Sequence, residues 1–198
     1  MYRERKGLLL IADISGYTEY LESTELAHAQ GIIADLLETL IDAGGEAFEV
    51  AKLEGDAVFF LAEDQTLGPD GLRDGIGRML DAFHGRQATI TSTNTCRCRG
   101  CVCACKLGIK FVAHYGSFGE HTVHGLRELI GPEVILVHRL LKNTIGLREY
   151  AAFTVALLER FGEAAPPVDS RHVERYEHIG AVELGVWDLH SQRQPATA

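Results

Sequence analysis

The first third of the chain alternates short apolar runs with one long segment of helical periodicity. Gly7–Ala12 is a continuous apolar run, which is typical of a buried strand. Glu19–Ala43 repeats its apolar positions at helical spacing until a Gly-Gly pair ends the pattern. Two further apolar runs, Glu46–Leu53 and Ala57–Leu61, are separated by a turn that contains an acidic residue and a glycine. The pattern therefore predicts a strand, a helix and a β-hairpin.

The rest of the chain continues to mix the two periodicities. The expected elements are a loop at 68–71, a helix over 72–91, a strand at 107–115, a polar loop at 117–127, a helix that starts at Pro132, an apolar run of undetermined type at 152–158 and a hairpin at 176–189. This order predicts an α+β protein with helices packed on a mostly antiparallel sheet.

Composition narrows the classes of function. The chain has 198 residues and is 46% hydrophobic, so we expect one domain over residues 1–190 and a disordered tail at 191–198. The formal charge of −9, without a stripe dense in Lys and Arg, argues against a nucleic-acid partner. The sequence lacks an apolar stretch of about 18 residues, so we expect no membrane span and a cytoplasmic protein.

The cysteines are concentrated in one segment. All five lie within ten residues: Cys96, Cys98, Cys101, Cys103 and Cys105. Converging thiolates suit a tetrahedral Zn²⁺, so we predict a structural zinc insert at 94–106 with Cys96, Cys98, Cys101 and Cys103 as ligands. His114, His121, His124 or a second subunit could instead complete the ligand shell. An iron–sulfur cluster and a reduced loop without metal are the alternatives.

Two carboxylates are expected to meet at one end of the sheet. Asp13 follows the first strand and Asp56 lies in the turn of the hairpin, and a β-α-β-β layout places these strands side by side. Paired carboxylates suit Mg²⁺ or Mn²⁺ shared with a polyphosphate, and N–H groups near Ser15–Thr18 suit phosphate oxygens. Alternatively, Asp56 is an ordinary turn residue and Asp13 serves a helix N-terminus.

Five segments resemble the catalytic domain of class III nucleotidyl cyclases, in that family's order. IADISGYTEYL is similar to its first-strand motif, F-x-D-I-x-G-[FY]-T, and KLEGDAVFFLAE is similar to its K-x-x-G-D hairpin. Weaker matches are KFVAHYG, ELIGPEVILVHRLLKN and HIGAVELGVWDL. The matches cover about 1–61 and 106–190, and they imply a ferredoxin-like fold derived from βαββαβ. The cysteine segment lies before the fourth strand. In this insert the chain resembles a bacterial branch of cyclase-like proteins.

The resemblance implies a metal and phosphate site at the end of the first strand. Asp13, Asp56 and the carbonyl of Ile14 are the implied ligands of Mg²⁺ or Mn²⁺. The implied substrate-binding loop consists of Gly16, Tyr17 and Thr18.

The resemblance also implies a nucleoside triphosphate as the partner, and a head-to-tail homodimer that completes each site. Lys52 and Glu128 occupy the positions that recognise the adenine base in this family. Their presence favours ATP over GTP as the substrate. Arg139 occupies the position of the family's arginine, which neutralises charge on the α-phosphate in the transition state.

Two positions depart from the family pattern. Ile135 replaces the transition-state Asn, and Ile179 replaces the Lys that binds the triphosphate. His138, Lys142 and Arg175 are candidate substitutes. Loss of one such donor typically lowers the rate by ~10²–10³. Three hypotheses follow: a cyclase that converts ATP to cyclic AMP and pyrophosphate, a non-catalytic nucleotide-binding or regulatory module with a structural zinc site, and a redox or metal sensor built on the cysteines.

Overall fold

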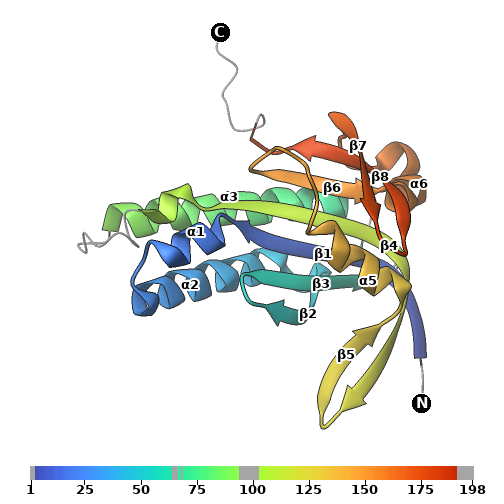
Figure 1. Ribbon diagram of the computed structural model, residues 1–198, viewed down its shortest axis with the longest axis horizontal. Coiled ribbons are helices and arrows are strands. Elements are labelled where there is room, and N and C mark those ends of the chain that lie inside the picture. The colour runs from blue at the N-terminus through green and yellow to red at the C-terminus, as the bar shows by residue number, and fades with distance from the viewer. Residues whose placement is uncertain (1–2, 64–66, 68, 94–102, 191–198) are drawn as a thin grey trace.

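A computed structural model describes residues 3–63, 67, 69–93 and 103–190. The described strands form one eight-stranded sheet in the order β2-β3-β1-β4-β6-β8-β7, with β5 paired to β4 (Figure 1). The strands are β1 (Arg3–Ser15), β2 (Glu49–Glu54), β3 (Ala57–Glu63), β4 (Gly108–Val123), β5 (Leu126–Ile130), β6 (Tyr150–Thr154), β7 (Ser170–Tyr176) and β8 (Gly180–Asp188). The helices are α1 (Tyr17–Glu22), α2 (Leu26–Gly44), α3 (Pro69–Thr93), α5 (Pro132–Leu140) and α6 (Val155–Phe161), with 3₁₀ turns at Gly45–Ala47, Ala104–Lys106 and Gly162–Ala164.

The sheet confirms the predicted α+β class. The strands pair antiparallel, except that β4 and β6 run parallel. The spatial order β2-β3-β1-β4 is that of a βαββαβ unit, and β6, β8 and β7 extend it. Among the described helices, none combines the length and apolar character needed to cross a bilayer.

Two hydrophobic cores cover the two faces of the sheet. Leu8 and Leu10 of β1 belong to the core under α2 and α3, whereas Leu9 and Ile11 belong to the core under α5. Figure 1 shows α2 and α3 running along one side of the sheet. Successive side chains of a strand point to opposite faces, so Asp13 lies on the face of Leu9 and Ile11, which α5 covers.

Some expected elements differ from the structure, and the run of undetermined type is now resolved. The predicted loop at 117–127 is wrong, because β4 continues to Val123 and pairs with β5 in an arm that projects from the body (Figure 1). The residues at the outer end of this arm are exposed on both faces. Their sequence therefore lacks the alternation of apolar and polar residues that indicates a half-buried strand. The helix expected over 19–43 is divided, and at the break Ser23 Oγ donates to the Tyr20 carbonyl at 3.1 Å. The apolar run at 152–158 spans the end of β6 and the start of α6.

Gly75 and Gly77 of α3 should respond in opposite ways to replacement by alanine, as measured by the free energy of unfolding. A Cβ on Gly75 would lie 2.4 Å from Phe48 Cε2, whereas a Cβ on Gly77 would meet no atom within 4 Å. We expect Gly75→Ala to lower the free energy of unfolding by ~1–3 kcal/mol through overpacking. Gly77→Ala should raise it by up to ~1 kcal/mol through helix propensity. Denaturant unfolding of both variants measures this difference, and two effects of the same sign would contradict it.

Candidate metal and nucleotide site

Asp13 and Asp56 lie together near the C-terminal end of β1. Asp13 stands opposite Ala57 in the β1–β3 ladder, and the Ile14 N–H donates to the Asp56 carbonyl at 3.1 Å. Burial, and after it the negative charge of Asp13, raises the pKa of Asp56 to about 6. The Asp13 carboxylate is therefore near enough to oppose the ionisation of Asp56, and the two residues are neighbours as the strand layout predicted.

Lys110 of β4 neutralises part of this acidic pair. Its Nζ lies 2.9 Å from Asp13 Oδ2, and both side chains are mostly buried, with 22% and 15% of their surfaces exposed. Nζ also donates to the Leu141 carbonyl at 3.4 Å. Sequence reasoning missed this residue, although a lysine inside the apolar strand LGIKFVAHY was an available signal.

Lys52 and Glu128 form the pair that the resemblance implies. The Lys52 ammonium of β2 donates to both carboxylate oxygens of Glu128 on β5, at 2.8 and 2.9 Å. This hydrogen bond raises the pKa of Lys52. Both side chains are exposed at their ends, so a bound ligand can reach the donor and the acceptor together.

A second basic residue, His138 of α5, faces the hairpin that carries Asp56. Its Nε2 lies 2.9 Å from Glu54 Oε1, and its Nδ1 donates to the Val134 carbonyl at 2.6 Å. The hydrogen bond to Glu54 raises the pKa of His138, and the same bond lowers the pKa of Glu54. The hydrogen bond therefore favours the charged form of each partner.

Arg139 is exposed on α5 and is not brought to the carboxylates by any contact described in this chain. It lies one helical turn from Ile135, which is 58% exposed, so both residues occupy one outward face. Ile179, at the β7–β8 turn, is also exposed. Among the described residues, no ion pair or hydrogen bond joins Arg139 to Asp13 or Asp56.

The loop after β1 adopts a left-handed turn. Gly16 has φ 86° and precedes α1, and its carbonyl accepts from the Tyr20 N–H at 3.0 Å. Tyr17 is half-buried and Thr18 is exposed. A side chain at Gly16 would be strained by this φ value, which explains the glycine.

The end of the cysteine segment packs against this loop. A cavity of about 220 Å³ is lined jointly by residues of the two segments, among them Gly16, Tyr20, Cys103 and Lys106. Buried Gln87 of α3 fixes the segment by donating to the Ala104 and Leu107 carbonyls at 2.9 and 2.8 Å.

The zinc site itself stays a prediction. Cys96, Cys98 and Cys101 lie outside the described residues, and Cys103 and Cys105 are not paired in a disulfide. His121 lies along β4 from Gly108 by roughly 40 Å, at about 3.3 Å per residue. His124 is farther out, at the turn of the arm. His114 instead contacts Thr154 Oγ1 at 2.8 Å and Glu133 Oε2 at 2.7 Å, and burial lowers its pKa. These three histidines are therefore not gathered at Cys103.

The acidic pair fits a divalent ion that also binds phosphate. Among the described residues there is no cluster of three or more His, Cys, Asp or Glu side chains arranged for a metal. Mg²⁺, however, is commonly bound by one or two carboxylates together with substrate phosphates and water. The raised pKa of Asp56 shows that its charge is poorly compensated in this chain, as expected for a ligand of a cation.

Solved structures of nucleotidyl cyclases share this fold. The adenylyl cyclase CyaB from P. aeruginosa matches with a TM-score of 0.70 at 15% identity, covering 95% of this chain and 96% of that chain. The guanylyl cyclase Cya2 matches with a TM-score of 0.67 at 15% identity, covering 93% and 92%. The chain therefore has the fold of class III cyclase catalytic domains, as the motifs implied.

Within that fold, the chain belongs to the family described as "Protein of unknown function (DUF2652)", whose sequence model matches residues 33–150. It is also 35% identical over 168 residues to "Uncharacterized protein Rv2561/Rv2562" of Mycobacterium tuberculosis, which covers 82% of this chain and 76% of that protein. The family region includes Lys52, Asp56, Lys110 and Glu128, and it begins after Asp13.

Proposed function

We propose that this protein is a metal-dependent nucleotidyl cyclase-like domain that binds ATP and converts it to cyclic AMP and pyrophosphate. The observation that carries the proposal is the convergence of Asp13 and Asp56, with the pKa of Asp56 raised to about 6, at the end of β1 in a cyclase fold. In the reaction, the ribose 3′-oxygen bonds to the α-phosphorus, the bond from this phosphorus to the β-phosphate oxygen breaks, and the hydroxyl proton is released.

In this proposal, each residue has a separate task. Asp13, Asp56 and the Ile14 carbonyl would hold Mg²⁺ or Mn²⁺, which supplies positive charge for the polyphosphate when bound. Lys52 donates to a ring nitrogen of adenine and Glu128 accepts from its amino group. These two groups orient the base, and Gly16 keeps the loop close to the phosphates.

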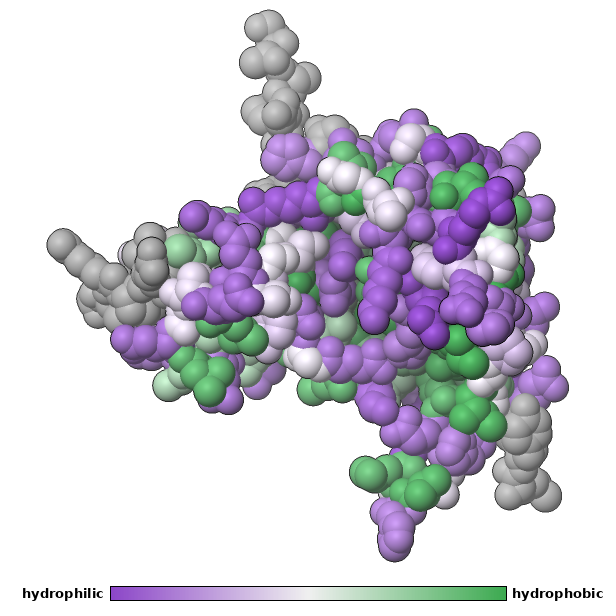
Figure 2. Space-filling view, in the orientation of Figure 1, coloured by the Kyte–Doolittle hydropathy of each residue, from purple (hydrophilic) through white to green (hydrophobic). Residues whose placement is uncertain are grey.

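A homodimer is part of the proposal, because among the described residues Arg139 forms no ion pair with the carboxylates of its own subunit. A second copy, placed head to tail, would bring its Arg139 to the α-phosphate. Exposed apolar residues support an assembly: Ile135 on α5, and Val123 and Leu126 on the arm, are 58%, 52% and 68% exposed. Figure 2 shows hydrophobic residues at the outer end of this arm.

Ile135 and Ile179 favour a second candidate function, a module that binds metal and nucleotide without turnover. Neither side chain can donate a hydrogen bond where the cyclase family has Asn and Lys. Zinc on Cys96, Cys98, Cys101 and Cys103 would stiffen this module, and it remains a proposal for either function.

One experiment tests the function and separates the two candidates. Purified protein is incubated with ATP or GTP and with Mg²⁺ or Mn²⁺, and cyclic nucleotide and pyrophosphate are separated chromatographically. We expect equal amounts of cyclic AMP and pyrophosphate. Thermal stabilisation by ATP and metal without product would assign the binding module, and neither turnover nor stabilisation would refute both candidates.

Lys110→Met should strengthen metal binding, because a divalent ion must displace the Lys110 ammonium from Asp13. We expect Mn²⁺ to bind about tenfold more tightly and the metal-free protein to be less stable, because Asp13 loses its buried partner. Melting temperatures with and without Mn²⁺ measure both effects. Lys6→Met, which removes the same charge near the start of β1, is the control, and equal Mn²⁺ responses in the two variants would contradict this role of Lys110.

A further inference from the structure

Five charged side chains form an ionic network at the base of the β4–β5 arm. The Nη2 atom of Arg5 lies 3.2 Å from Glu49 Oε2 and 2.7 Å from Glu63 Oε1. Its Nη1 atom lies 3.1 Å from Glu120 Oε2, and only 12% of the Arg5 side chain is exposed. Each of the first five strands contributes one member of the network: Arg5, Glu49, Glu63, Glu120 and Arg127.

Arg127 connects the arm to this ionic network. Its Nη1 contacts Glu49 Oε1, and its Nε contacts Glu120 Oε1. Each of these two carboxylates thus bridges the arginines, with one oxygen on Arg5 and the other on Arg127. The hydrogen bond to Glu49 raises the pKa of Arg127, and the same bond lowers the pKa of Glu49. Charges in a network stabilise a contact more than an isolated exposed pair does.

Strand pairing alone does not fix the arm beside β2. The β1–β4 ladder ends at Glu120. Among the described ladders, the rest of β4 pairs with β5 alone, and β5 pairs only with β4 (Figure 1). The ion pairs that join β5 to β2 in the described part of the chain are Arg127 with Glu49 and Glu128 with Lys52. The position of β5 relative to β2 therefore depends on these side chains.

The pair of Lys52 and Glu128 cannot hold the arm when a nucleotide binds. Its side chains are 46% and 39% exposed, and exposed ion pairs contribute little to stability. In the proposed function, the adenine base takes the Lys52 donor and the Glu128 acceptor, so the base replaces the contact between them. The link between Arg127 and Glu49 then remains to hold the arm beside β2.

We propose that Arg127 is a positioning residue that holds Glu128 opposite Lys52 and thereby sets the selection of the nucleotide base. The inference rests on the proposed function, because it concerns the same base-binding pair. Arg127 directly precedes Glu128 in β5, so its link to Glu49 limits the movement of Glu128 relative to β2. Without this link, the spacing between donor and acceptor no longer matches adenine, whereas the metal and phosphate site at the end of β1 is unchanged.

The pKa of Lys52, followed by NMR in the protein without nucleotide, tests the positioning role. The hydrogen bond to Glu128 raises this pKa, so we expect Arg127→Met to lower it by releasing Glu128. Loss of the positive charge of Arg127 would by itself raise the pKa of Lys52, so a fall reports the position of Glu128. Arg127→Lys keeps the charge and should give an intermediate value.

The matched control for Arg127→Met is Arg171→Met, which removes an exposed arginine from β7 at the opposite edge of the sheet. It should leave the pKa of Lys52 as in the parent protein. An unchanged or higher pKa of Lys52 in a folded Arg127→Met protein would overturn the proposal.

Nucleotide binding separates this role from the proposed function. Calorimetry with Mn²⁺ measures the affinity for non-hydrolysable analogues of ATP and GTP and for tripolyphosphate, which has no base. We expect Arg127→Met to bind the ATP analogue about tenfold more weakly, to discriminate less against the GTP analogue, and to bind tripolyphosphate like the parent. An equal loss for all three ligands would overturn the role in base selection. A parent protein that binds none of them would refute the proposed function, whereas a lowered pKa of Lys52 would still support the link between the arm and β2.

Discussion

Asp13→Asn is expected to reduce the formation of cyclic AMP by at least ~10²-fold and to remove stabilisation by Mn²⁺ in the presence of ATP. The asparagine keeps the size of the side chain but loses the charge that a divalent ion needs, and loss of one charge-stabilising group has effects of this order. Cyclic AMP release and melting temperatures with Mn²⁺ and ATP measure the two consequences.

The control for Asp13→Asn is Glu38→Gln, which neutralises an exposed carboxylate on α2. It removes the same charge away from the acidic pair and should retain both turnover and the Mn²⁺ response. Undiminished cyclic AMP formation by a folded Asp13→Asn protein would contradict the proposed role of this carboxylate. If the parent protein makes no product, the Mn²⁺ response alone decides the comparison.

Asp56→Asn should stabilise the metal-free protein at about pH 8, because it removes a carboxylate whose ionisation the fold opposes. The folded pKa of about 6 lies above the unfolded value of 3.8, so the parent protein loses stability as the pH rises between these values. Solvent screening at this half-buried position reduces the full value of the shift, so we expect a gain of about 1 kcal/mol.

The dependence on pH distinguishes this effect from ordinary repacking. The advantage of Asp56→Asn should shrink as the pH falls through 6 and vanish near the unfolded value of 3.8, where the parent carboxyl is protonated in both states. Denaturant unfolding across this range measures it. Saturating Mn²⁺ and ATP should reverse the order of stability, because the parent protein gains a ligand that the variant lacks. A constant advantage across this range would contradict the assigned cause.

Local sequence patterns predicted one part of the candidate site, the Asp13–Asp56 pair. The Glu-Gly turn predicted the β2–β3 hairpin, and the expected β-α-β-β layout placed β1 beside that hairpin, which brings Asp13 next to Asp56. The Lys52–Glu128 pair joins residues 76 apart and followed only from the resemblance. Its formation depends on the β4–β5 arm, whose exposed residues carry no alternating pattern.

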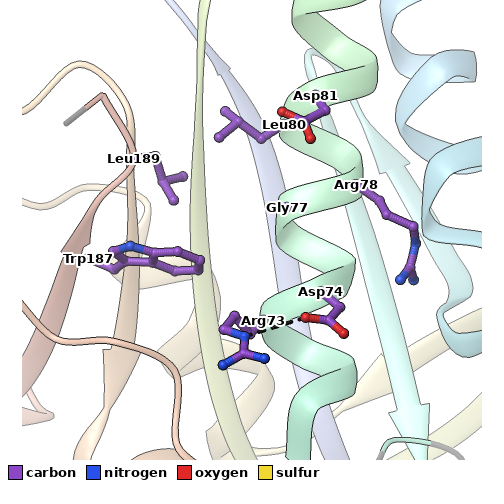
Figure 3. Close-up of a pocket in the computed structure, with 8 residues that line it drawn as sticks. All are labelled: Arg73, Asp74, Gly77, Arg78, Leu80, Asp81, Trp187 and Leu189. Carbon is purple, nitrogen blue, oxygen red and sulfur yellow. Dashed lines mark hydrogen bonds and ion pairs between the residues drawn. The ribbon is translucent and has the colours of Figure 1, made fainter. Parts of the chain in front are cut away.

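Contacts that depend on the register of distant strands could not be predicted. Lys110 meets Asp13 because β4 pairs with β1 in one register out of several that the apolar pattern allows. The pairing of Glu54 with His138 similarly depends on where α5 packs. A pocket of about 610 Å³ between Trp187 and α3, shown in Figure 3, likewise depends on tertiary packing.

The central claim is that Asp13 and Asp56 hold one divalent ion together with the phosphates of a nucleotide. Electron paramagnetic resonance of Mn²⁺, titrated into the protein with and without a non-hydrolysable ATP analogue, tests it most directly. We expect the analogue to strengthen Mn²⁺ binding in the parent protein. The Asp13→Asn and Asp56→Asn proteins should each lose this binding. Mn²⁺ binding that is equal in all three proteins, or absent from the parent with the analogue, would contradict it.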